Sequence, residues 1–140
     1  MVNCLDVFMR HANGTAAKWD LIFFNSGLHN LDNSTRGLAA YRSQLGQIVA
    51  GLKRLQPQAT LVWGTTTPFM PDKTAGNFAV EQQNAIAAKV MAANRIPSVD
   101  LYARVIARCG ELYKMCEICD DESRFHPDVY CGYHYTGGGF

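Results

Sequence analysis

The sequence lacks any cluster of lysines or arginines, and it has no long apolar run. Its 140 residues include 13 Lys or Arg and 12 Asp or Glu, which gives a net charge of +1. This balance argues against nucleic acid or an anionic membrane surface as the main partner. The apolar runs are only a few residues long, so no membrane span is expected. The first residues also lack the basic-then-apolar order of a signal peptide.

The remaining composition is that of a folded domain. The chain is 48% hydrophobic and 18% charged, which is typical of globular proteins. Its length allows one domain with a substantial core, but not two. We therefore treat residues 1–140 as a single domain, and the sequence indicates no oligomeric state.

Cysteine is concentrated near the end of the sequence. Four of the five cysteines lie in the last third, which predicts a stapled loop over residues 109–134, held by disulfides or by a metal. Disulfides would favour a secretory or extracellular location. Because the count is odd, one thiol is left over, and the first cysteine is the candidate for it. The alternative is that one cysteine has its partner outside this chain. The five are Cys4, Cys109, Cys116, Cys119 and Cys131.

A zinc site is the second interpretation of this loop. Cys116 and Cys119 form a C-x-x-C pair, and His126, Cys131 or His134 has suitable ligand chemistry. However, no second C-x-x-C follows, and the gap to His126 is irregular. Disulfides within the loop are favoured instead, and their connectivity cannot be deduced from the spacing. We expect no metal and no cofactor.

Helical and extended patterns alternate along the chain. This alternation predicts an α/β fold with a parallel sheet between layers of helices. Three short strands make a narrow sheet for four helices, and the chain starts inside a helix. We therefore expect a domain that is incomplete at its N-terminus and also at its C-terminus. Helices are expected over 4–12, 34–55, 77–94 and from Asp100 onward, and strands over 21–24, 59–65 and 96–101.

The most informative segment is the apolar strand at residues 21–24 and the polar turn that follows it. Four consecutive apolar residues suit a strand that is buried on both faces. In open α/β sheets, ligands bind just beyond the carboxyl ends of the strands. Asn25, Gly27, His29 and Asn30 therefore fall where such a fold places its chemistry.

Residues 24–31 and 133–140 together resemble two blocks of the SGNH (GDSL-type) hydrolases. The first segment is similar to the third block of this family, in which a strand ends in G-x-N-D or G-L-H-D. The second resembles the fifth block, in which the catalytic His precedes an aromatic residue, Thr or Pro, and a G-Y or G-F pair. Residues 61–68 are similar to the central strand and its loop, and Asn84 fits the usual order. The resemblance covers roughly residues 20–140 and implies a flavodoxin-like three-layer α/β/α fold.

The chain departs from the family pattern at three places. No G-D-S motif is present, so the nucleophilic Ser of the family has no counterpart in this chain. In the third block, His29 stands at the Asn position and Asn30 at the Asp position. In the fifth block, Cys131 stands at the position of the triad Asp. The second-block Gly of the family would also lie upstream.

The resemblance implies ester hydrolysis through a Ser acyl-enzyme, without a cofactor. His134 is the candidate general base, since it lies in a turn-rich segment that can reach the sheet edge. A base also needs an acceptor that holds its tautomer. Asp128 or Asp121 is the candidate acceptor, since Cys131 is a poor substitute. The alternative for His134 is a surface histidine in the cysteine-rich loop.

Each residue after the first strand likewise allows one functional and one structural interpretation. Asn25 and Gly27 can offer a side-chain amide and a backbone N–H to an oxyanion, or they can form an ordinary strand-end turn. His29 either donates to the substrate or packs under the loop. Residues 65–67 are three threonines that can line the pocket, although a solvated strand tip is the preferred interpretation.

The sequence therefore predicts an SGNH-type O-acyl esterase domain that lacks its nucleophile and is inactive alone. Its substrate would be a small ester or an acylated carbohydrate. The first alternative is a non-catalytic SGNH-like domain that binds a carbohydrate or a protein. The second is a small zinc-binding module.

Overall fold

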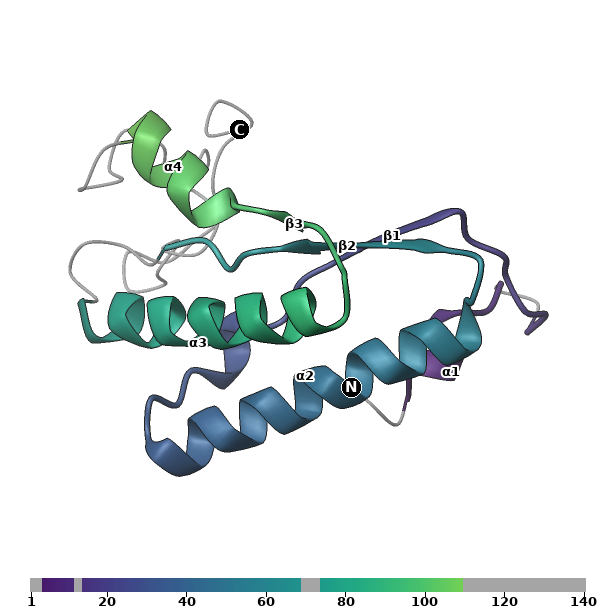
Figure 1. Cartoon of the computed structure of the whole chain (residues 1–140), viewed down its shortest axis with the longest axis horizontal. Helices are drawn as coiled ribbons and strands as arrows, with labels where there is room; N and C mark the ends of the chain where they lie inside the picture. The colour runs from purple at the N-terminus through teal and green to yellow at the C-terminus, as the bar shows by residue number, and fades with distance from the viewer. Residues whose placement is uncertain (1–3, 12–13, 69–73, 110–140) are drawn as a thin grey trace, which may run out of the picture.

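The computed structural model describes residues 4–11, 14–68 and 74–109. A three-stranded parallel sheet lies at the centre, as expected, and its strand order is β1-β2-β3. The helices α2 and α3 lie on one face of this sheet, and α4 lies on the other (Figure 1). The fold is thus a three-layer α/β arrangement of the flavodoxin-like type. The elements are α1 (Leu5–Phe8), β1 (Leu21–Phe24), the 3-10 helix η2 (Leu28–Asn30), α2 (Thr35–Leu55), β2 (Thr60–Gly64), α3 (Thr74–Ala93), β3 (Ser98–Val99) and α4 (Leu101–Cys109).

The α2 helix forms where its apolar pattern and its cap predict it. Ser34 is the N-cap, and its hydroxyl accepts a hydrogen bond from the Gly37 backbone N–H at 3.0 Å. This contact satisfies one of the free N–H groups of the first turn. The apolar residues recur on one helix face and face the sheet. Those that are buried are Tyr41, Leu45, Ile48, Val49 and Leu52.

The main core lies between α2, α3 and the sheet. Trp63 of β2 is fully buried there, and its ring meets that of Phe24 edge-on with the centroids 5.2 Å apart. Met91 of α3 is also fully buried, and Leu5 of α1 joins the same cluster. This core therefore fixes β1 and β2 against the two long helices.

The prediction that β1 is buried on both faces is wrong. Ile22 and Phe24 face the core, but Leu21 is 57% exposed and Phe23 is 52% exposed. The reason is that α2 and α3 cover only one face of β1, while α4 lies beside β3 on the other (Figure 1). The ring of Phe23 lies over Gly64, where a Cβ atom would come within 2.6 Å of it.

The outer edge of β1 has no strand beside it among the described residues. The Thr60 N–H donates to the Asp20 carbonyl, and Leu21 pairs with Thr60. Because a parallel ladder directs the main-chain groups of alternate residues toward the same neighbour, those of Asp20, Ile22 and Phe24 face β2. The N–H and C=O groups of Leu21 and Phe23 therefore face away from β2.

The N-terminal helix is shorter than the residue pattern predicts. It ends at Phe8, whose side chain is 64% exposed, instead of continuing to residue 12. The chain turns back here, because Arg10 pairs with Ala16 in an antiparallel bridge. Gly14 lies in this turn with φ at +80°, a conformation that favours glycine. The hydrogen bonds of this turn replace those of a further helical turn.

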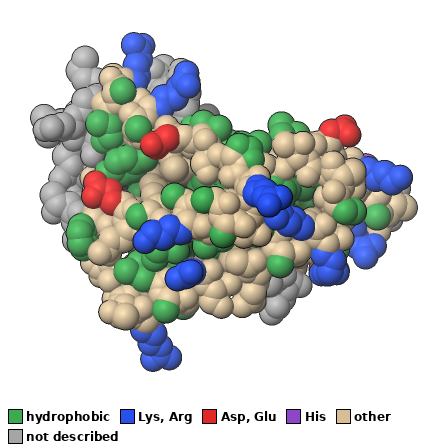
Figure 2. Space-filling view, viewed as in Figure 1, with side chains coloured by type: hydrophobic (Ala, Val, Ile, Leu, Met, Phe, Trp, Pro, Cys, Tyr) green, Lys and Arg blue, Asp and Glu red, His purple; other side chains and the backbone are tan. Residues whose placement is uncertain are grey.

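The face of the molecule seen in Figure 2 has no extended basic region. Lys and Arg side chains are spread over the face in Figure 2 and do not gather in one patch. No described helix is long and apolar enough to cross a membrane. Among the described residues, Cys4 is exposed and free.

Candidate functional site

The carboxyl ends of the three parallel strands meet at one edge of the sheet. Residues 25–31 follow β1, residues 65–68 follow β2, and Asp100 follows β3. The structure therefore brings Asn25, Gly27 and His29 to the edge where the α/β fold places ligands.

Asn25 joins the ends of β1 and β2. Its amide nitrogen donates to the Gly64 carbonyl at 2.7 Å and lies 3.5 Å from the Thr66 hydroxyl. Both contacts are made by the Asn25 amide nitrogen, which is the donor that an oxyanion would need. In this geometry the Asn25 amide holds two strand ends in register.

Gly27 lies where the loop after β1 approaches β2. It is buried, and a Cβ atom at this position would come within 2.6 Å of the Thr66 hydroxyl and 3.1 Å of the Gln83 Oε1 atom. Its φ of 164° is extended backbone that any residue adopts. The need for glycine here therefore comes from space and not from a left-handed turn.

Asn84 of α3 forms a paired contact that the sequence pattern did not reveal. Its Oδ1 atom accepts from the Thr66 N–H and its Nδ2 atom donates to the Thr66 carbonyl, both at 2.9 Å. Thr66 is only 3% exposed, so the interpretation of residues 65–67 as a solvated strand tip is wrong at this residue. A polar amide in the interior of a helix, where its propensity is poor, was the available signal.

Thr65 and Asp100 connect β2 to the start of α4. The Thr65 hydroxyl donates to Asp100 Oδ1 at 3.1 Å and accepts from the Tyr102 N–H at 2.9 Å. Asp100 Oδ1 also accepts from the Ala103 N–H at 2.9 Å, which caps α4. The loops after all three strands are thus held by side chains that bind neighbouring elements.

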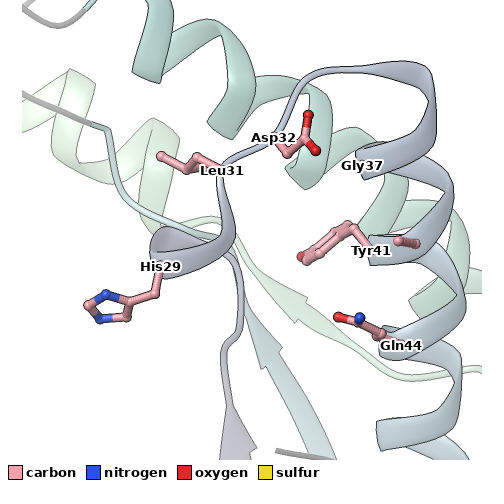
Figure 3. Close-up of a pocket in the computed structure, with 7 residues that line it drawn as sticks. His29, Leu31, Asp32, Gly37, Tyr41 and Gln44 are labelled. Carbon is pink, nitrogen blue, oxygen red and sulfur yellow. The ribbon is translucent and has the colours of Figure 1, made fainter.

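His29 lies in η2 and is exposed. Its side chain forms no hydrogen bond with any other described residue. Its imidazole points away from Tyr41 and Gln44 (Figure 3). Asn30 is the last residue of the same 3-10 turn.

A cavity of about 380 Å³ lies between the loop after β1 and the first turns of α2 (Figure 3). Tyr41 forms part of its wall and donates from its hydroxyl to the Ser26 carbonyl at 2.7 Å. Burial raises the pKa of the Tyr41 phenol, because the charged form would lose its hydration. The lining residues are His29, Leu31, Asp32, Gly37, Ala40, Tyr41 and Gln44.

Asp32 lies at the entrance of α2. Its Oδ1 atom accepts from the Ser34 N–H at 2.9 Å. Hydrogen bonds from the Ser34 side chain and backbone lower the pKa of the Asp32 carboxyl, because they favour its charged form. The carboxyl group lies directly against Gly37, where a side chain would overlap with it.

The predicted residues of the cysteine-rich loop lie outside the described part of the chain. These include the candidate base His134, its candidate partners Asp128 and Asp121, and the candidate metal ligands Cys116, Cys119, His126 and Cys131. Within the described residues, no group of three His, Cys, Asp or Glu side chains has the arrangement of a metal site.

Comparison with solved structures identifies the fold. The chain matches a lipase/acylhydrolase from Enterococcus faecalis with a TM-score of 0.58 and 15% identity, over 86% of this chain and 54% of that one. The fold is that of this hydrolase. A second solved structure matches with a TM-score of 0.64 and 16% identity, over 99% of this chain and 63% of that one. The chain thus spans between half and two thirds of the length of these two structures.

The sequence comparisons add no family assignment. No protein-family model matches the chain, and no curated protein sequence matches it significantly. The likeness to the hydrolase is therefore one of fold.

Proposed function

We propose that this chain is part of an SGNH-type ester hydrolase domain that works through a Ser acyl-enzyme. The observation that carries the proposal is that no described strand pairs with the outer edge of β1, and that β1 ends in the loop that bears Gly27 and His29. A hydrolase of the same fold, with a longer chain, supports the class of reaction.

The outer edge of β1 supports a nucleophile that comes from a further strand beside it. The N–H and C=O groups of Leu21 and Phe23 face away from β2, and their side chains are more than half exposed. A further parallel strand fits this edge, because it would pair with these groups, and a helix following it would cover the two side chains. The residue after such a strand would lie beside the loop at residues 25–31. A Ser at that point would be next to the candidate oxyanion donors.

The residues of this chain then have defined roles. The Ser oxygen attacks the acyl carbonyl and passes its proton to His134, which returns it to the departing alcohol. Asp128 holds the imidazole of His134 in the required orientation. His29 and the backbone at Gly27 stabilise the oxyanion, and Asn25 keeps the loop in place. Water then releases the acid by the same proton transfers, and the reaction uses no cofactor.

The test compares this chain with a longer protein that includes the upstream coding sequence. We expect a G-D-S motif upstream, reaction of its Ser with a fluorophosphonate probe, and turnover of p-nitrophenyl acetate by the longer protein. His134→Ala should lower kcat by about 100-fold or more, the usual contribution of a general base. His11→Ala is the matched control, since His11 is exposed and lies in the turn before β1, outside the loops that follow the strands.

The 140-residue chain alone should neither react with the probe nor turn over the ester. Turnover by this chain that His134→Ala abolishes would contradict the proposed source of the nucleophile. A longer protein without a G-D-S motif and without probe labelling would favour the non-catalytic binding domain, which the altered third and fifth blocks also suggest.

A further inference from the structure

The cavity beside the third-block loop has a mostly polar lining, of which the proposed reaction uses His29 alone. Asp32 and Gln44 contribute a carboxylate and an amide, and His29 borders the cavity from the loop. Leu31 and Ala40 supply the smaller apolar part. The volume of about 380 Å³ lies at the lower end of small-molecule sites, which span roughly 300 to 1,000 Å³.

Two of these polar groups have unused hydrogen-bonding capacity. The Gln44 side chain is exposed and forms no hydrogen bond with any other described residue, so it can both donate and accept. Asp32 accepts hydrogen bonds from the backbone and the side chain of Ser34, which leaves further acceptor positions on its carboxylate. In Figure 3, Tyr41 and Gln44 project from α2 toward the loop, and Asp32 lies near the start of the helix.

The lining excludes several classes of ligand. A long acyl chain would lie against the Asp32 carboxylate and the Gln44 amide, which it could not satisfy. An anion would be repelled by Asp32, and no Lys or Arg lines the described cavity. A flat aromatic ligand cannot stack on the ring of Tyr41, which is only 7% exposed. A neutral ligand with several hydroxyl groups satisfies both the carboxylate and the amide.

We propose that this cavity binds the alcohol part of the ester, and that this part is a sugar of monosaccharide or disaccharide size. Hydroxyl groups of the sugar donate to Asp32 and exchange hydrogen bonds with Gln44. His29 connects the two sites, since it borders the cavity while it belongs to the third-block loop. The inference rests on the proposed function for the ester bond, but the sugar contacts depend only on residues of this chain.

The test is binding of a sugar ester to the 15N-labelled 140-residue chain, followed by NMR. We expect methyl 6-O-acetyl-β-glucopyranoside to cause saturable shifts of the Ala40 and Gln44 amides. Hexyl acetate carries the same acyl group without a sugar, and it should cause none at the same concentrations. Gln44→Leu should raise the Kd for the sugar ester about 2- to 12-fold, which is the effect of one hydrogen bond.

Matched variants separate binding from general effects on the helix. Gln47→Leu should leave the Kd unchanged, because Gln47 is exposed on the same helix but does not line the cavity. Ala40→Leu should weaken binding by narrowing the cavity, whereas Ala39→Leu, at the exposed neighbouring position, should not. The absence of saturable shifts, equal binding of hexyl acetate, or equal Kd values for the Gln44→Leu and Gln47→Leu variants would overturn the inference.

The two proposals fail separately. If the longer protein hydrolyses p-nitrophenyl acetate but the labelled chain does not bind the sugar ester, only the sugar site is wrong. If the labelled chain binds the sugar ester but the longer protein does not react with the fluorophosphonate, only the hydrolase assignment is wrong.

Discussion

Replacing Gly27 by alanine tests whether close packing controls the loop after β1. A Cβ atom at this position would lie 2.6 Å from the Thr66 hydroxyl, whereas ordinary contacts begin at 3.4 Å. The neighbours must therefore move by about 0.8 Å. Thr66 is 3% exposed and Gln83 is fully buried, so neither side chain can swing out into solvent. Overpacking of this kind costs about 1–3 kcal/mol.

The assay is guanidinium unfolding followed by circular dichroism. Gly46→Ala is the control, since it adds the same methyl group inside α2, where nothing lies within 4 Å. Alanine is the better helix former, so this variant should gain about 0.5–1 kcal/mol. The two substitutions should therefore change the free energy of unfolding in opposite directions.

A double mutant identifies the contact responsible. Thr66→Ala removes the hydroxyl that a Cβ atom at Gly27 would meet, so it should recover most of the loss caused by Gly27→Ala. The coupling between the two changes should then be about 1 kcal/mol or more. The reasoning is refuted if Gly27→Ala is as stable as the original chain, or if the two effects simply add.

Two further predictions concern hydrogen bonds, and a third concerns the ionisation of Tyr41. Asn84→Ala should lower the free energy of unfolding by about 1–3 kcal/mol in the same assay, because the buried Thr66 loses two partners; a loss below 0.5 kcal/mol would contradict the pairing. Ser34→Ala should cost about 1 kcal/mol, because the N–H of Gly37 loses its cap, and unchanged helicity and stability would argue against it. Burial raises the pKa of Tyr41 above 10 in the folded state, so the unfolded chain releases this proton first. Above pH 10 the group should therefore reduce stability by up to about 1.4 kcal/mol per pH unit. Tyr41→Phe should remove that part of the alkaline loss, and identical pH profiles for the two proteins would exclude it.

The sequence predicted the elements whose determinants are local. The α2 helix has its cap at Ser34 and its apolar face from Tyr41 to Leu52, and both features lie within the helix itself. The same holds for the alternation of strands and helices along the chain, because each apolar run is short and ends in turn residues. The position of Gly27 at the carboxyl edge of the sheet followed from the same pattern.

The failures concern partners that are distant in the chain. The strand that contains Phe23 has the composition of a strand buried on both faces. The exposure of Phe23, however, depends on which helices cover the sheet. The space at Gly27 is limited by Thr66, and Thr66 in turn is held by Asn84 on a third element. Such contacts leave no periodic signal in the sequence. The early end of α1 likewise depends on the bridge between Arg10 and Ala16.

The outer edge of β1, which no described strand covers, affects how long the chain survives inside a cell. Leu21 and Phe23 expose apolar side chains beside main-chain groups that no described strand pairs. Surfaces of this kind promote aggregation and are recognised by chaperones and proteases. Expressed alone, the chain should be cleared quickly, and its steady-state level should rise when the edge is covered. The cellular abundance of the chain thus measures whether this edge is covered, and no assay of catalysis is needed.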